Sequence, residues 1–238
     1  MSLPDYAGLT RDDPNPLKRW LQRRRLDDAL AALPRDLEPR VVVDYGAGDG
    51  ELARRLAERF SQARVVAFEP APEFAAAARL RLGTRGEVAE DEDALPEAAD
   101  LVVCTEVFEH LPPEQEVAAL ERIGGMLGAN GRLLIGVPVE VGPPALVKGL
   151  FRMARRAGEE DARPGAIWAA FSGRPSRERG TVLLAGRPYH PSHTGFDHRA
   201  FAARLRARFE VEGARNSPLA RAPVWASAET YMLARNRS

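Results

Sequence analysis

The stretch VVVDYGAGDGELARRL, residues 41–56, constrains the fold of this chain more than any other segment. It opens with a short apolar, β-branched run, which predicts a buried parallel strand at residues 40–44. Gly46, Gly48 and Gly50 follow at alternate positions, and a helical pattern then begins. A strand, a glycine-rich turn and a helix in this order are typical of a doubly wound α/β sheet, in which the turn approaches a ligand.

The remainder of the chain alternates between strand and helix patterns, which predicts helices on both faces of a Rossmann-like, seven-stranded sheet. The last two strands are joined by a loop without a crossover helix, so we expect a mostly parallel sheet with an antiparallel last strand. Asp197 is the expected N-cap of the last helix. The predicted strands are 40–44, 65–68, 87–89, 100–104, 132–138 (after a turn at Asn130-Gly131), 209–214 and 229–234, and the predicted helices are 16–34, 50–60, 73–82, 114–127 and 198–208.

Composition excludes several classes of protein. A formal net charge of +0 argues against a protein that binds nucleic acid through bulk charge. No apolar run reaches the roughly 18 residues that a membrane-spanning helix needs. The N-terminus lacks the pattern of a signal peptide, and Cys104 is the single cysteine, so we expect a cytoplasmic location. The oligomeric state is left open.

The spacing of the glycines decides between ligands. A dinucleotide fingerprint requires its third glycine at position 51, which is Glu51, and the Gly-Lys-Ser/Thr ending of a phosphate loop is absent. Asp44 at the end of the first strand would repel a pyrophosphate but suits a cationic amine. Glu69, at the tip of the next strand, can accept hydrogen bonds from both hydroxyls of a ribose. S-adenosylmethionine has a ribose, a positive amine and no phosphate.

Four segments together resemble the class I S-adenosylmethionine-dependent methyltransferases. VVVDYGAGDG (41–50) is similar to their first motif and VVAFEPAPEF (65–74) to their second. EDEDALPEAADLVVCTEVFEHL (90–111) is similar to the adenine-contacting acidic segment, the fourth strand and the Glu-His-Leu of the small-molecule branch, which acts on quinones, sugars and other natural products. LERIGGMLGANGRLLIGVP (120–138) resembles the helix, turn and fifth strand that follow.

The resemblance implies a role for each matched position. The loop after the first strand would hold the methionine part of the cofactor, Glu69 the ribose, and Asp91 the adenine amine, although Glu92 or Asp93 beside it could take that part. Cys104 is expected to be a small buried strand residue. The cofactor-binding set implied in this way is Asp44, Gly46, Ala47, Gly48, Glu69, Pro70, Asp91, Glu92 and Thr105.

Four histidines carry the remaining candidate chemistry. His193, which precedes a helix, and His110, which follows the fourth strand, are candidate general bases for an acceptor hydroxyl. The alternatives are that these imidazoles only bond backbone or line the pocket, or that His190, His193 and His198 chelate zinc through their spacings of three and five. The favoured interpretation contains no metal.

The expected acceptor is a small molecule with an oxygen or nitrogen nucleophile. The segment after the fourth strand lacks the Asn/Asp-Pro-Pro-aromatic stretch of enzymes that methylate nucleic-acid amines. A methyltransferase acting on protein or RNA, and a cofactor-binding module without catalysis, remain as alternatives.

We expect one methyltransferase domain over 1–238, with an N-terminal helical cap (1–34), a cofactor-binding core (40–138), an insertion or lid (141–192) and the rest of the sheet (193–238). Within the insertion, residues 143–158 predict a helix whose apolar face covers the acceptor pocket while its basic residues face solvent. The alternative is that this helix rests on an anionic membrane surface. The apolar face consists of Leu146, Val147, Leu150, Phe151 and Ala154.

Overall fold

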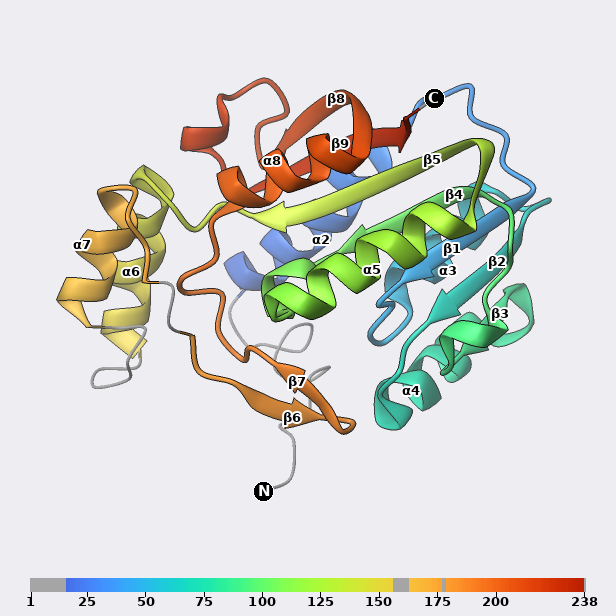
Figure 1. Cartoon of the computed structure of the whole chain (residues 1–238), viewed down its shortest axis with the longest axis horizontal. Helices are drawn as coiled ribbons and strands as arrows, with labels where there is room; N and C mark the ends of the chain where they lie inside the picture. Colours follow the sequence, from blue (N-terminus) through green and yellow to red (C-terminus); the bar gives the residue numbers. More distant parts are fainter. Residues whose placement is uncertain (1–15, 156–162, 177–178, 238) are drawn as a thin grey trace.

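The computed structural model describes residues 16–155, 163–176 and 179–237. Its centre is a seven-stranded sheet with the strand order β3-β2-β1-β4-β5-β9-β8 (Figure 1). Strand β9 runs antiparallel to both of its neighbours, and the other strands are parallel to one another, as predicted. The strands are β1 (Val41–Tyr45), β2 (Arg64–Phe68), β3 (Glu87–Ala89), β4 (Ala99–Thr105), β5 (Leu127–Pro138), β8 (Phe209–Ser217) and β9 (Glu229–Asn236).

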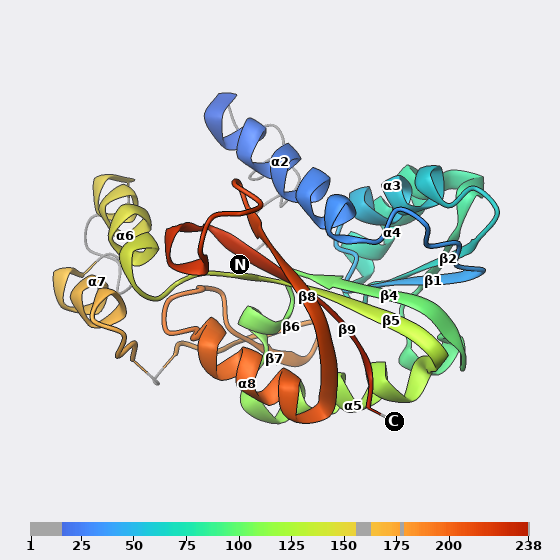
Figure 2. The same cartoon turned by 90° about the horizontal axis from the view of Figure 1, so that it is seen from above.

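Helices cover both faces of this sheet, because successive strand residues point to opposite sides. Val42 packs with α2 and α3, whereas Val43 packs with α5 and α8. Seen from above, α2, α3 and α4 lie on one side of the strands, and α5 and α8 lie on the other (Figure 2). These helices are α2 (Pro16–Ala32), α3 (Glu51–Arg59), α4 (Pro72–Leu82), α5 (Pro113–Met126) and α8 (His198–Arg208).

The strand order places a crevice at one end of the sheet. From β1 the chain moves outward to β2 and β3, then crosses back to β4 on the other side of β1. The connections after β1 and β4 therefore diverge at the carboxyl ends of two adjacent strands. In open α/β sheets, ligands bind at such a switch point.

The predicted elements are present, with two differences in the core. Asn130-Gly131 does not start a separate strand: β5 begins at Leu127, directly after α5, because Leu127 pairs with Ala99 before the register shifts. The loop between β8 and β9 is shorter than predicted, since β8 extends to Ser217.

The first half of helix α2 contains exposed apolar residues. Trp20 is 52% exposed and Leu21 is 36% exposed, whereas Ala29 and Leu33 are buried in the core. The later part of the helix packs against the sheet, and the earlier part extends past it (Figure 2).

Within its described residues, the insertion contains two helices and a hairpin, where the sequence predicted one helix. These are α6 (Pro143–Arg155), α7 (Pro164–Phe171) and the antiparallel pair β6 (Val182–Leu184) and β7 (Arg187–Tyr189). Helices α6 and α7 pack on each other at one end of the molecule (Figure 1). The end of the predicted helix, residues 156–158, lies outside the described residues.

The lid orientation predicted for α6 is wrong. Val147 is 71% exposed and Leu150 62% exposed, and the pocket described below is not lined by α6. The basic residues turn inward instead: Lys148 Nζ donates to Glu140 Oε1 at 2.7 Å, and Arg152 also pairs with Glu140. The buried Glu140 carboxylate requires cationic partners, and this requirement outweighs burial of the apolar face.

No helix within the described ranges is both long enough and apolar enough to cross a bilayer. Contact of α6 with a membrane surface stays a prediction, and the structure changes how it should be tested. The exposed side chains that could enter a bilayer are apolar, namely Leu150 and Phe151 of α6 and Trp168 of α7.

We predict that a Leu150→Glu/Phe151→Glu variant sediments less with anionic vesicles than the unsubstituted protein, because it places charge on the inserting face. The matched control is Leu80→Glu on α4, which changes a leucine that is 88% exposed elsewhere. Failure of the unsubstituted protein to sediment at low salt would exclude the contact.

Candidate active site

A cavity of about 910 Å³ opens at the carboxyl ends of β1, β2 and β4. Its walls come from the loops after these strands, from α2, and from the β6–β7 hairpin. The volume lies at the upper end of the roughly 300–1,000 Å³ that is usual for small-molecule sites. A cavity of this size has room for a cofactor and a second small molecule.

The glycine turn after β1 forms the floor of the cavity. Gly46 has a φ of +80°, and a Cβ atom there would lie 2.3 Å from Val107 Cγ2. A Cβ atom at Gly48 would meet nothing within 4 Å, so the backbone here faces open space. Gly50, not position 51, allows the close helix contact, because a Cβ atom there would lie 2.8 Å from Ala78 Cα.

Asp44 is a buried carboxylate at the start of this turn. It is 1% exposed and lines the cavity, yet its Oδ2 atom has no hydrogen-bond partner among the described residues. Burial raises its pKa to about 7, and the charge of Glu69 contributes to this shift. A buried carboxylate oxygen without a donor is costly unless a cationic ligand completes it.

Glu69 links the ends of β1 and β2. Its Oε2 atom accepts from Gly48 N–H at 2.8 Å, and its Oε1 atom accepts from Ala71 N–H at 2.9 Å. Burial raises the pKa of this carboxyl group. Each oxygen keeps a further lone pair for the cavity, where the sequence predicts ribose hydroxyls.

In the acidic segment, Glu92 and not Asp91 reaches the cavity. Asp91 caps the following turn by accepting from Asp93 N–H at 3.1 Å. Glu92 lines the cavity and accepts from the hydroxyl of Tyr45 at 2.9 Å. The other predicted positions Ala47, Pro70 and Thr105 also line it. Cys104 is fully buried, as expected, and burial raises its pKa well above the usual value.

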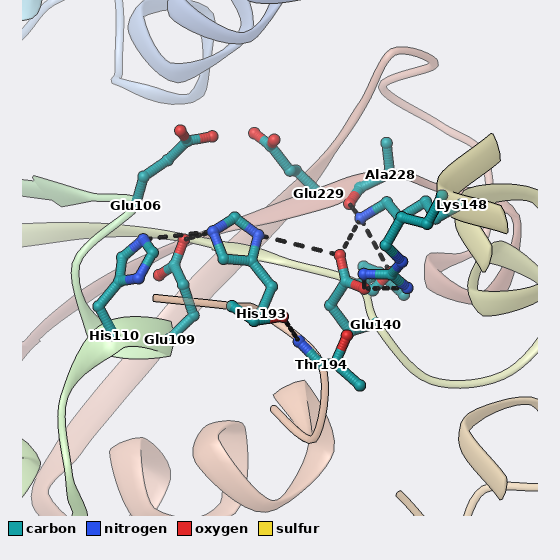
Figure 3. Close-up of polar contacts among 12 residues, drawn as sticks. Glu106, Glu109, His110, Glu140, Lys148, His193, Thr194, Ala228 and Glu229 are labelled. Carbon is teal, nitrogen blue, oxygen red and sulfur yellow. Dashed lines mark hydrogen bonds and ion pairs between the residues drawn. The ribbon is translucent and has the colours of Figure 1, made fainter. Parts of the chain in front are cut away.

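The opposite side of the cavity brings together residues that lie far apart in the sequence. His110 Nε2 and His193 Nε2 are 3.2 Å apart, although 83 positions separate them. Glu109 is fully buried beside them, with its Oε1 atom 3.9 Å from His193 Nε2 (Figure 3). The His110 ring stacks on Tyr189 of β7 with centroids 4.5 Å apart. His110 lines the cavity directly.

Burial favours the neutral forms of His110, His193 and Glu109. It lowers the pKa of His110, and with the neighbouring His110 it lowers the pKa of His193 to about 3. Burial, together with the charge of Glu106, raises the pKa of Glu109 well above its usual value. Both imidazoles are therefore uncharged at neutral pH and can accept a proton or bind a cation.

A network of charges that the sequence did not reveal surrounds the histidines. Arg25 of α2 pairs with Glu106 after β4 and with Glu229 of β9. Glu106 has a φ of +57°, which is uncommon for a residue with a side chain and directs it to this network. Arg179 donates to the carbonyl oxygens of Glu109, Ser192 and Thr194 and so fastens the loop that carries His193.

The remaining histidines do not join this group. His190 Nδ1 donates to the carbonyl of Gly180 at 2.9 Å, and His198 is buried in the first turn of α8. Among the described residues, the set with metal-ligand spacing is Glu109, His110 and His193. Sequence spacing alone would have grouped His190, His193 and His198.

Residues 43–133 match the model of the family described as "Methyltransferase domain". This span of the chain is a methyltransferase domain. The matched span runs from β1 to β5 and contains Asp44, the glycine turn and Glu69. The buried acceptor oxygen of Asp44, the carboxylate of Glu69 and the open backbone at Gly48 fit S-adenosylmethionine, the cofactor of such domains.

Curated relatives match part of the chain. It is 29% identical over 151 residues to the trans-aconitate 2-methyltransferase of Methylobacterium radiotolerans, which is 63% of this chain and 53% of the relative. It is 34% identical over 119 residues to the enzyme of that name from Mycobacterium sp. strain KMS, covering 50% and 45%. The chain thus spans about half the length of these relatives.

Solved structures share the fold of this chain at low sequence identity. The PH0226 protein of Pyrococcus horikoshii has a TM-score of 0.64 at 12% identity, covering 99% of this chain and 100% of that one. The 1,6-didemethyltoxoflavin-N1-methyltransferase of Burkholderia thailandensis, solved with S-adenosylhomocysteine, has a TM-score of 0.56 at 22% identity, covering 100% and 92%.

We predict that the affinity for S-adenosylmethionine falls as the pH drops below about 7, the pKa of Asp44 in the free protein. A cationic amine binds the ionised carboxylate, so protonation of Asp44 competes with binding, by up to about tenfold per pH unit. Calorimetry from about pH 5.5 to 7.5, where the amine stays charged, measures this dependence.

The isosteric Asp44→Asn variant should bind weakly with a flat pH profile. Asp100→Asn, a change at the amino end of β4 that affects the backbone N–H groups of Arg40 and Val41, should keep the dependence. A flat profile in the unsubstituted protein would contradict the role of Asp44.

Proposed function

We propose that this chain transfers the methyl group of S-adenosylmethionine to an oxygen or nitrogen nucleophile of a small-molecule acceptor. The observation that carries the proposal is one cavity with two chemically different ends. At one end lie the carboxylates of Asp44 and Glu69, and at the other lie His110 and the carboxylates around it. Residues Glu69 and His110 belong to one continuous wall, which suits two molecules bound side by side.

The β6–β7 hairpin favours a small acceptor over a macromolecule. Val182, Leu184, Pro188 and Tyr189 of the hairpin line the cavity, so the hairpin takes the place that the sequence predicted for α6. Protein or RNA acceptors need an open groove beside the cofactor. A hairpin over the acceptor end narrows the site, which suits a small acceptor.

The charged side chains of the cavity wall are of both signs. Glu106 and Glu229 line the acceptor end and pair with Arg25, and Arg19, Arg23 and Arg187 line the same cavity. The relatives named above are trans-aconitate 2-methyltransferases, and trans-aconitate is a tricarboxylate. A wall with charges of both signs accommodates neutral and anionic acceptors, so the test below includes both kinds.

Methyl transfer is an in-line displacement that needs positioning more than activation, because the sulfonium already carries the positive charge. The acceptor atom must lie about 3 Å from the methyl carbon and in line with the bond that breaks. Assistance to the removal of a proton from an acceptor hydroxyl is worth about 10²–10⁴-fold in rate, and His110 lies at the acceptor end where such assistance is needed.

The test is turnover with S-adenosylmethionine and a panel of phenols, sugar hydroxyls, amines and trans-aconitate, with detection of S-adenosylhomocysteine. We predict product with at least one hydroxyl or amine acceptor of the panel. Trans-aconitate as the best acceptor would show that this chain shares the substrate named for its relatives. Tight cofactor binding with no acceptor turned over would favour a cofactor-binding module.

A further inference from the structure

The cluster of Glu109, His110 and His193 has a buried carboxylate for which the described residues supply no donor. Glu109 is 0% exposed, and neither Oε1 nor Oε2 has a hydrogen-bond partner. One ligand atom from each residue of the cluster lies within 4.8 Å of the others. Buried polar atoms that lack a partner point to a missing ligand.

The hydrogen bonds of the histidines orient their lone pairs toward each other. His110 Nδ1 lies 2.7 Å from the carbonyl oxygen of His190, which can only accept, so Nδ1 carries the proton and Nε2 is a free acceptor. His193 Nδ1 faces Glu140 Oε1 at 4.0 Å, and Lys148 holds that carboxylate in place (Figure 3). Histidines that bind metals characteristically point their other nitrogen at a carbonyl or a carboxylate.

The distance between the two Nε2 atoms fits a shared ion. Zinc–nitrogen bonds of about 2.0–2.1 Å in a tetrahedral site place two nitrogens about 3.3 Å apart. The observed separation of His110 Nε2 and His193 Nε2 is 3.2 Å. The Glu109 oxygen, 3.9 Å from His193 Nε2, needs a small side-chain rotation to complete the set.

We propose that Glu109, His110 and His193 bind one divalent transition-metal ion of the Zn²⁺ type. Two imidazoles and one carboxylate suit Zn²⁺ better than Mg²⁺, which prefers oxygen ligands. Three protein ligands leave a coordination position open, as in catalytic metal sites. His110 lines the acceptor end of the cavity, so the open position faces the acceptor.

The role of the ion rests on the proposed function. An acceptor hydroxyl bound at the open position has a lowered pKa and releases its proton to water. The resulting oxygen attacks the methyl carbon: the new O–CH₃ bond forms, the S–CH₃ bond breaks, and its electron pair stays on sulfur as the neutral thioether. The site therefore selects an oxygen acceptor.

The competing explanation is an ordinary hydrogen bond from His193 Nε2–H to His110 Nε2, with one imidazole acting as the base. This explanation also predicts a loss of turnover in His110→Ala and His193→Ala variants. Metal binding distinguishes the two explanations, because a hydrogen-bonded pair needs no ion.

The experiment uses the full chain, freed of metal with a chelator and dialysed against Zn²⁺ or Mg²⁺. We expect one tightly bound Zn²⁺ per chain, measured by mass spectrometry, with Mg²⁺ bound far more weakly. We expect Zn²⁺ binding to weaken by at least roughly 10–100-fold in each of the variants Glu109→Gln, His110→Ala and His193→Ala. Loss of a residue that only hydrogen-bonds to a metal ligand already costs about that much. The control His198→Gln should retain the ion.

Two further readouts guard against misfolding and separate the two proposals. Zn²⁺ should raise the thermal midpoint of the unsubstituted protein but not of Glu109→Gln. Calorimetry should show S-adenosylmethionine binding unchanged in all four variants. Absence of Zn²⁺ binding, or equal binding by Glu109→Gln, would overturn the metal site. Zn²⁺ binding without cofactor binding would leave the site intact and refute the proposed function.

Discussion

The Glu69 carboxylate is the contact on which the arrangement of the cofactor end depends. It accepts from Gly48 N–H in the turn after β1 and from Ala71 N–H after β2, so it holds two loops in one position. The parallel pairing of β1 with β2 brings Tyr45 beside Phe68 and so places these loop starts next to each other. With the turn held in this way, Asp44 remains at the base of the cavity with an oxygen free for a ligand.

Acidic residues recur along the carboxyl edge of the sheet. Strands β1, β2, β4 and β5 each contain or precede an acidic residue at this edge: Asp44, Glu69, Glu106 and Glu140. At β4 and β5 the protein supplies the counter-charge itself, through Arg25 for Glu106 and through Lys148 for Glu140. At β1, by contrast, Asp44 Oδ2 has no cationic partner among its described contacts. This is expected if a cationic ligand binds there.

Local patterns predicted the core because they depend on local physics. The β-branched strands, the glycine turn and the Asp197 cap were all visible in short windows of sequence, and all three are present. Glu69 was located because strand ends of a parallel sheet share one edge. Its second role, holding Gly48 N–H, depends on a contact across 21 positions and left no local signal.

The insertion and the acceptor end were predicted less well, for the same reason. The amphipathic pattern of α6 identified a helix, but the buried charge of Glu140 determined which face turned inward. Spacing suggested His190, His193 and His198 as a group, whereas the fold brings His193 to His110 through the loop that Arg179 fastens. The contact between His110 and His193 spans 83 positions, and the partners of the buried Glu140 depend on which face of α6 turns inward. Both depend on tertiary structure, which periodicity does not encode.

The most direct test of this account is calorimetric titration of S-adenosylmethionine and NADH into the unsubstituted protein and Glu69→Ala. The account predicts one S-adenosylmethionine site per chain, no binding of NADH, and an affinity for S-adenosylmethionine at least about tenfold weaker in the variant, because two charge-assisted hydrogen bonds to the ribose are lost. Circular dichroism should show that the variant remains folded. Unchanged affinity in the folded variant, or binding of NADH in place of S-adenosylmethionine, would contradict the assignment of the S-adenosylmethionine site to the carboxyl edge of the sheet.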